Sequence, residues 1–213
     1  VVMMDKTGTM TEGNPSVTFH NLSPEDLAAA AAIEKNSGHP LAKAITASAG
    51  EDLPEVEDME EIAGKGVSGV VYGTRYQVGK PASYDAYSGY LEAGRTVVEV
   101  DREGVGVGFF VIEDKIRDDS PAAVEGMKSL GLLPVMVTGD NELTARAVAR
   151  RVGITEVLSG VRPEDKLDIV RTYQAKGKKV LMIGDGINDA AALKGADIGM
   201  AIGSGMDLAI DSA

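Results

Sequence analysis

The sequence predicts an α/β protein: a parallel, doubly wound sheet interrupted by an inserted α+β module that carries an antiparallel sheet. From about Val107 to the C-terminus, short apolar runs alternate with helical segments that end at glycine. Residues 14–112 instead show two helical segments followed by short β-like runs with turn signals between them. The opening apolar run VVMM is expected to join the parallel sheet. We therefore expect one domain of residues 1–13 and 113–213, with a second domain of residues 14–112 inserted into it.

The inserted module begins with two predicted helices. The first is SPEDLAAAAAIEKN, where Ser23 and Asp26 form a capping pair, and the second is PLAKAITASAG, which starts at Pro40. The stretches GVSGVVYGTRYQVG and TVVEVDREGVGVGFF follow, and their turn signals predict an antiparallel sheet. His20 has no other functional residue near it in the sequence and is expected at the surface.

Strands and helices alternate regularly in the C-terminal half. Strands are expected at 107–112, 132–140, 154–160, 178–186 and 196–203, and helices at 120–131, 141–153, 162–177 and 188–195. In the first of these helices Ser120 is the expected N-cap, Pro121 the first helical residue and Gly131 the end.

Composition excludes several classes of protein. The net charge of −12 disfavours nucleic acid and anionic lipid as partners. The chain has no cysteine, which rules out disulfides and thiolate metal sites within it. No apolar run approaches the roughly 18 residues that a membrane span requires.

Three predicted parallel strands end in polar loops, MMDKTG, MVTGD and MIGDGIND. Because the carboxyl ends of parallel strands meet at one edge of a sheet, their polar residues should converge. These residues are Asp5, Thr138, Asp140, Asp185 and Asp189. Neighbouring carboxylates raise each other's pKa, so we expect positive charge among them, from Mg²⁺ and from Lys166 at the start of a helix. Any one of these aspartates, taken alone, would be explained equally well as a loop or capping residue.

The motifs DKTGTMT, TGD and GDGIND resemble those of the P-type ATPases, ion pumps built on the haloacid-dehalogenase-like fold. They occur in the family's order, with Lys166 between the last two, and Met10 replaces the usual leucine. The resemblance implies that Asp5 is the nucleophile that takes the γ-phosphoryl group of ATP. It also implies that Mg²⁺ binds Asp5, the Thr7 backbone carbonyl and Asp185.

The same resemblance assigns supporting roles. Lys166 would steady the transferred oxygens, and the Thr138-Gly139-Asp140 loop would cradle the phosphate. Asn188 and Asp189 would support the metal shell. Asp114 and Arg117, within EDKIRDD, match a hinge motif beside the nucleotide.

The segments NSGHPLAKAI and AGKGVSGVVYG resemble the nucleotide-binding module of heavy-metal-transporting, type IB, P-type ATPases. Glu34, His39, Gly64 and Gly66 then match that family's adenine site. A dinucleotide-binding glycine loop would have to open a helix, whereas this one opens a β-like run. Without the resemblance, His39 would read as a helix-start residue before Pro40. Gly38 departs from the family, where many members carry glutamate before the histidine.

The resemblance implies the ATP-dependent catalytic part of a heavy-metal pump at the cytoplasmic face of a membrane, with copper(I) as the most frequent cargo in the family and zinc, cobalt or cadmium as the alternatives. Its partners would be an actuator domain and membrane helices that this chain does not contain. A free-standing phosphatase of the same fold is the alternative. Thr7 disfavours it, because such phosphatases carry a second aspartate there as acid and base. A third class is a nucleotide-binding regulatory module without catalysis.

Overall fold

The computed structural model describes residues 1–62, 64–186 and 189–202, and it divides into two compact units. The first unit comprises Val1–Gly13, Glu92–Gly94 and Lys115–Ala213, and the second comprises Asn14–Leu91 and Arg95–Asp114. Each unit has its own sheet and its own hydrophobic core. No helix within the described part of the chain is long and apolar enough to cross a membrane.

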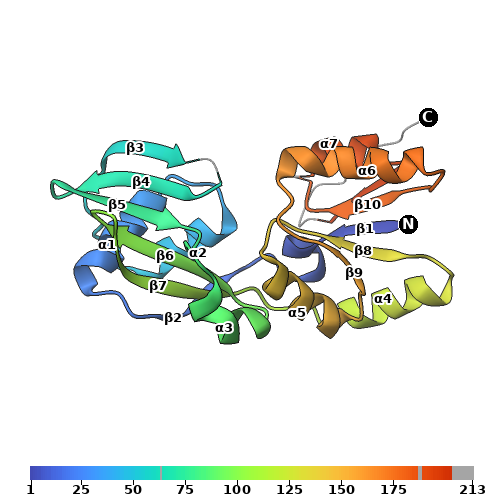
Figure 1. Ribbon diagram of the computed structural model, residues 1–213, viewed down its shortest axis with the longest axis horizontal. Helices are drawn as coiled ribbons and strands as arrows, with labels where there is room; N and C mark the ends of the chain where they lie inside the picture. The colour runs from blue at the N-terminus through green and yellow to red at the C-terminus, as the bar shows by residue number, and fades with distance from the viewer. Residues whose placement is uncertain (63, 187–188, 203–213) are drawn as a thin grey trace. The chain divides into compact units, whose positions relative to one another are not determined.

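The first unit is built on a five-stranded sheet in which every strand pair is parallel (Figure 1). The strand order is β11-β10-β1-β8-β9. The strands are β1 (Val2–Asp5), β8 (Pro134–Val137), β9 (Glu156–Leu158), β10 (Leu181–Gly184) and β11 (Ile198–Ala201). The opening apolar run therefore joins the parallel sheet, as predicted, and forms its central strand. The order reverses on either side of β1, so Asp5 at its end lies where open α/β sheets place their ligands.

Helices cover both faces of this parallel sheet (Figure 1). The helices are α4 (Ser120–Ser129), α5 (Glu142–Val152), α6 (Lys166–Ala175) and α7 (Ala190–Gly195). Val2 and Met4 pack in one core cluster with α4 and α5, and Met3 packs in the other with α6 and α7. Because successive side chains of a strand point to opposite faces, a run of four apolar residues is what a strand covered on both sides requires.

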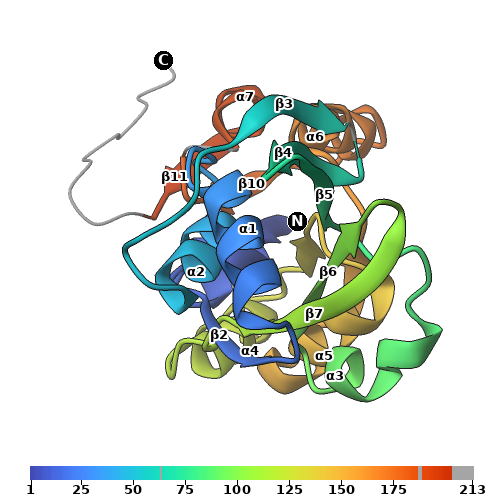
Figure 2. The same ribbon diagram turned by 90° about the vertical axis from the view of Figure 1, so that its left-hand side faces the viewer.

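The second unit contains a six-stranded antiparallel sheet in the order β2-β7-β6-β5-β4-β3. The strands are β2 (Ser16–His20), β3 (Glu57–Ile62), β4 (Gly66–Val71), β5 (Thr74–Gly79), β6 (Thr96–Arg102) and β7 (Val105–Glu113). The helices are α1 (Pro24–Glu34), α2 (Pro40–Ser48) and the short α3 (Ser88–Glu92). Figures 1 and 2 both show α1 and α2 next to each other against this sheet. The alanine run of α1 is buried in the core with Tyr76 and Phe110.

The N-terminus of α1 is fixed by the predicted pair. The Asp26 backbone N–H donates to Ser23 Oγ at 3.1 Å, and the Ser23 hydroxyl donates to Asp26 Oδ2 at 2.6 Å. The buried Asp26 carboxylate also accepts hydrogen bonds from Tyr76 on β5, at 3.2 Å, and Arg102 on β6, at 3.1 Å. These bonds attach the start of α1 to the sheet.

Three sequence predictions differ from the structure. The strand at 107–112 belongs to β7 of the antiparallel sheet and is not the first element of the parallel one. Asp119 is the N-cap of α4, while Ser120 is the first helical residue and its hydroxyl donates to Met10 O at 3.0 Å. His20 is only partly exposed, because its ring packs against Phe110 with centroids 6.0 Å apart.

Candidate active site

The loop after β1 holds the candidate nucleophile. Asp5 ends the strand and only 6% of its surface is exposed, and the chain then winds tightly through Lys6–Met10. Gly8 adopts a φ of +71°, a left-handed conformation that favours glycine. Thr11 closes the loop, because its hydroxyl accepts from Gly8 N at 3.2 Å and donates to Lys6 O at 3.1 Å. The loop therefore keeps Asp5 at a fixed position on the edge of the sheet.

Lys166 bridges two carboxylates at this edge. Its Nζ lies 3.0 Å from Asp5 Oδ1 and 2.5 Å from Asp189 Oδ1. Lys166 is the first residue of α6 and Asp189 immediately precedes α7, so the three side chains come from three separate elements. All three are buried, with exposed fractions of 6% or less. A buried cation is stable here because both neighbours carry the opposite charge.

Burial and charge act in opposite directions on these groups. Burial raises the pKa of Asp5 to about 6 and outweighs the neighbouring Lys166 ammonium, which lowers it. Burial alone would lower the pKa of Lys166, but the Asp5 and Asp189 carboxylates together raise it. Lys166 is therefore held in its charged form at neutral pH.

Two buried oxygens at this edge have no partner among the described residues. They are Asp189 Oδ2 and Thr9 Oγ1. The first lies against the backbone of Gly184, where an added Cβ would come within 2.1 Å of it. Gly184 therefore leaves the space that the Asp189 carboxylate occupies. A buried oxygen without a partner is costly, and an ordered water or an ion is a usual partner for such a group.

The loop after β8 contributes Thr138, Gly139 and Asp140. The Thr138 hydroxyl donates to Asp140 Oδ2, and the Asp140 N–H donates back to Thr138 Oγ1, both at 3.2 Å. The Nζ of Lys6 lies 2.5 Å from Asp140 Oδ2. This ion pair connects the loop after β1 with the loop after β8.

The loop after β10 carries Asp185. A Cβ added at Gly8 would lie 3.4 Å from Asp185 Cβ, so Asp185 sits beside the Asp5 loop. The first unit thus brings together Asp5, Asp185, Asp189 and Lys166, and links Asp140 to them through Lys6. Asn188 lies outside the described residues. Asp189 is expected from the sequence to support the metal shell. In the structure its carboxylate forms an ion pair with Lys166.

These residues fit a magnesium site in which the protein supplies only a few of the metal ligands. Within the described ranges, no three His, Asp or Glu side chains are grouped so as to hold a metal ion. Mg²⁺ is usually bound by one or two carboxylates, with waters and substrate phosphates completing the octahedron. Asp5 and Asp185 supply two carboxylates on adjacent loops, and their hard oxygens suit this ion. Aspartates outnumber lysines at this edge of the sheet, so its net charge is negative and favours a divalent cation.

In the second unit, Glu34 and His39 lie on either side of the α1–α2 connection. Glu34 ends α1 with 9% of its surface exposed, and burial raises the pKa of its carboxyl to about 7. His39 is the N-cap of α2, where its Nδ1 accepts from Leu41 N at 3.2 Å. The sequence-based explanation of His39 as a helix-start residue is thus correct for its Nδ1 atom.

Gly64 and Gly66 stand at the beginning of β4. Gly66 has a φ of +144°, and an added Cβ would come within 2.1 Å of Val78 O on β5. The backbone requires glycine there whatever it binds. Gly64 has a φ of +75° and no atom within 4 Å of an added Cβ. Further along β4, a Cβ at Gly69 would meet the side chain of Ile33, the neighbour of Glu34, so the end of α1 lies over this strand.

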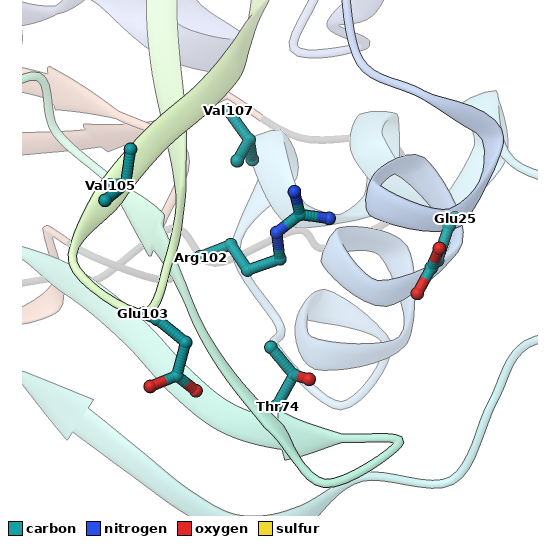
Figure 3. Close-up of a pocket in the computed structure, with 6 residues that line it drawn as sticks. All are labelled: Glu25, Thr74, Arg102, Glu103, Val105 and Val107. Carbon is teal, nitrogen blue, oxygen red and sulfur yellow. The ribbon is translucent and has the colours of Figure 1, made fainter.

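A pocket of about 470 Å³ opens elsewhere on the second unit (Figure 3). It is lined by Glu25, Thr74, Arg102, Glu103, Val105 and Val107. None of these was a predicted site residue. Arg102 reaches across the pocket toward α1, where its guanidinium binds Asp26, so its main contact stabilises the fold.

Asp114 and Arg117 belong to different units. Asp114 Oδ1 accepts from Asn14 N at 3.3 Å, within the second unit. In the first unit the Arg117 N–H donates to Met10 O at 3.0 Å, and its side chain lies 3.8 Å from Asp119. These contacts hold the chain near two of the places where it passes from one unit to the other, Gly13–Asn14 and Asp114–Lys115.

Comparison with known proteins decides the family. The haloacid dehalogenase-like hydrolase family matches residues 1–197. A solved catalytic domain of the CPx-ATPase CopB-B, described as changing conformation upon nucleotide binding, is 36% identical with a TM-score of 0.79. The match covers 92% of this chain and 75% of that domain. The chain belongs to the haloacid dehalogenase-like hydrolases and, among them, to the catalytic domains of CPx-type P-type ATPases.

Curated P-type ATPases are similar over the whole chain. A probable copper-transporting ATPase, PacS, of Synechococcus elongatus is 43% identical over 98% of the chain. A silver exporting P-type ATPase of Salmonella typhimurium is 39% identical over 100% of it. The chain spans only 31% and 28% of the length of these two relatives. The matched region is thus the part of a P-type ATPase that carries the DKTG, TGD and GDGIND motifs.

Sequence reasoning missed Lys6 and Thr11. Lys6 stands directly after the nucleophile and is 6% exposed, and Thr11 is 1% exposed. A signal for Lys6 was present, because it directly follows Asp5 at the end of a predicted buried strand. Its partner Asp140 could not be read from the sequence, since 134 positions separate the two.

Proposed function

We propose that the chain is the ATP-binding, autophosphorylating catalytic core of a heavy-metal-exporting P-type ATPase. One observation carries this proposal: a buried aspartate at the end of the central strand, with its Oδ1 held 3.0 Å from the ammonium of Lys166. A carboxylate in this position is a competent covalent nucleophile for a phosphoryl group.

In the proposed reaction, an Asp5 oxygen forms a bond to the γ-phosphorus of ATP while the bond to the β–γ bridging oxygen breaks and ADP leaves. Phosphoryl transfer depends mainly on positioning and charge neutralisation. Lys166 supplies a fixed positive charge to the attacking carboxylate and to the transferred oxygens. Asp189 keeps the Lys166 ammonium in place, because its Oδ1 lies 2.5 Å from Nζ.

In this proposal the remaining motif residues have supporting roles. Thr138 and Gly139 cradle the phosphoryl group, with Asp140 orienting the Thr138 hydroxyl. Asp5, the Thr7 carbonyl and Asp185 hold Mg²⁺, and Asn188 and Asp189 support that shell. When bound, Mg²⁺ neutralises negative charge on the transferred group.

Residues 14–112, most of which lie in the second unit, serve as the nucleotide-binding domain, and residues 1–13 and 113–213 form the phosphorylation domain. Glu34, His39, Gly64 and Gly66 contact the adenine, with Asp114 and Arg117 beside the nucleotide at the connections. Glycines at Gly64 and Gly66 let the backbone approach a ligand closely. The burial of Glu34 at the end of α1 and the exposure of His39 at the start of α2 support this placement.

The whole protein would also contain membrane helices, through which the metal passes, and an actuator domain, with this core at the cytoplasmic face. Copper is the proposed cargo, because PacS carries that name among the relatives, and silver is the alternative. The free-standing phosphatase is disfavoured, because Thr7 supplies no carboxylate that could activate water.

Single-turnover labelling with γ-labelled ATP and Mg²⁺ tests the proposal. The wild-type chain should take up label, Asp5→Asn should not, and a chase with unlabelled ATP should remove the label slowly. Label that survives Asp5→Asn, or rapid release of phosphate in the chase, would contradict the pump core and favour the phosphatase.

A further inference from the structure

Lys6 is a buried charge for which the proposed reaction has no role. It follows Asp5 in the chain, yet its ammonium points to a different partner, 2.5 Å from Asp140 Oδ2. The two side chains are 7% and 15% exposed. Successive residues at a strand end project in opposite directions, which separates the Lys6 side chain from that of Asp5. Asp5 and Asp140 are thus paired with different lysines: Asp5 with Lys166, which also binds Asp189, and Asp140 with Lys6.

Asp140 Oδ2 is shared between two donors. It accepts the Lys6 ammonium and also the Thr138 hydroxyl, and the second contact is the longer one at 3.2 Å. The Thr138 hydroxyl is the group that the proposed reaction turns toward a phosphoryl oxygen. The Thr138 hydroxyl points its proton at Asp140 Oδ2 while that oxygen is a strong hydrogen-bond acceptor. The Lys6 ammonium binds the same oxygen and competes with the hydroxyl for it. The hydrogen bond from Thr138 to Asp140 therefore becomes weaker.

The backbone of this loop is fixed independently of Lys6. Thr138 N donates to Leu158 O at 2.9 Å, Val161 N donates to Thr138 O at 3.0 Å, and Gly160 N donates to Asp140 O at 2.8 Å. The loop would therefore keep its course without Lys6. What Lys6 sets is the charge and orientation of the Asp140 carboxylate beside the Thr138 hydroxyl.

We propose that Lys6 is a positioning residue that acts through Asp140: it neutralises the Asp140 carboxylate and so allows the Thr138-Gly139 loop to accept a phosphoryl group. This role rests on the proposed function. Without Lys6, an unpaired carboxylate would stand beside the incoming anion and hold the Thr138 proton. Lys6 itself does not contact the phosphoryl group, because its ammonium is committed to Asp140.

The test measures Mg²⁺-dependent binding of BeF₃⁻, a phosphoryl mimic, by calorimetry in four proteins: wild type, Lys6→Met, Asp140→Asn and the double variant. We expect Lys6→Met to weaken binding about tenfold or more, and the double variant to recover most of that loss, because it has no unpaired charge. Lys6→Arg should bind almost as wild type. NMR spectra confirm that each variant is folded.

The comparison of Asp140→Asn with the double variant does not depend on whether Lys6→Met folds. If Lys6 acts only through Asp140, removing it from Asp140→Asn changes the Kd less than about threefold. Arg146→Met in the same background measures the effect of losing a positive charge, since Arg146 forms an exposed ion pair with Glu142 on α5.

Three results would overturn the inference. A double variant as weak as Lys6→Met would mean that Lys6 contacts the phosphoryl group directly. Unchanged binding in a folded Lys6→Met protein would mean that the ion pair only stabilises the fold. Absence of Mg²⁺-dependent binding in the wild type would refute the proposed function itself, and this role with it.

Discussion

Lys166 Nζ lies 3.0 Å from Asp5 Oδ1 in a site where both residues are almost fully buried. Asp189 Oδ1 contacts the same ammonium at 2.5 Å. Two carboxylates this close are stable together only because a cation lies between them. The proposed nucleophile Asp5, the Lys166 cation and Asp189 therefore form one cluster of ion pairs.

Replacing Lys166 should abolish most of the phosphorylation. In Lys166→Met two buried carboxylates face each other with no cation, so we expect the rate of labelling by γ-labelled ATP to fall on the order of a hundredfold or more. The control is Lys194→Met, which removes an exposed lysine from α7. Labelling of Lys166→Met at nearly the wild-type rate would show that the ion pair has no part in transfer.

Asp185 should be needed for the metal. Asp185→Asn removes one of two carboxylates on adjacent loops, so binding of BeF₃⁻ should become weaker and should require more Mg²⁺, by about tenfold. Asp168→Asn, an exposed position on α6, is the control for the loss of one negative charge. Equal Mg²⁺ dependence in wild type and Asp185→Asn would remove Asp185 from the metal shell.

The arrangement of the parallel sheet was predictable from the sequence, because the residue patterns of its individual strands and helices agree with the observed fold. The alternation of strands and helices after the insertion and the four apolar residues before Asp5 both require a sheet covered on two faces. The clustering of Asp5 and Asp185 followed from the same topology. These features depend on the order and direction of the strands, which the alternation of strand and helix patterns along the sequence predicts.

Pairings across the fold were not predictable, because they depend on side-chain geometry. Ser120 before Pro121 has the sequence of an N-cap, but its hydroxyl reaches Met10 O, 110 positions away, and Asp119 takes the cap. Lys6 and Asp140 pair for the same kind of reason. The packing of His20 against Phe110 likewise required the register of β2 on β7.

His39 should contribute to nucleotide binding through its ring. Because its Nδ1 caps α2, His39→Ala removes both a cap and an imidazole, whereas His39→Asn keeps a good capping residue. Both variants should bind ATP several-fold more weakly by NMR titration, and only His39→Ala should lose about 1 kcal/mol of stability. The other histidine of the chain provides the control, His20→Gln. If His39→Asn binds ATP as wild type does, the imidazole has no role in the adenine site.

Burial of Glu34 should make stability depend on pH. Its pKa is raised from 4.5 to about 7, so the folded chain binds more protons than the unfolded chain between these values. The contribution of Glu34 to the free energy of unfolding therefore falls as pH rises through this window. Relative to wild type, Glu34→Gln should gain about 1–3 kcal/mol between pH 5 and pH 8.

Urea unfolding followed by tyrosine fluorescence measures this difference, because five of the six tyrosines lie in the second unit. The exposed Glu25 on the same helix is the control, as Glu25→Gln. A stability difference between Glu34→Gln and wild type that stays constant from pH 5 to pH 8 would mean that the Glu34 carboxyl is not desolvated.

The central claim is that Asp5 receives the phosphoryl group, and chemical trapping tests it most directly. Borohydride reduces an acyl phosphate on aspartate to homoserine, which marks the residue that carried it. After brief reaction with ATP and Mg²⁺, peptide sequencing of the reduced chain should find homoserine at position 5, and none when ATP is omitted. Homoserine at another aspartate, or ATP hydrolysis without any trapped residue, would contradict the assignment of Asp5.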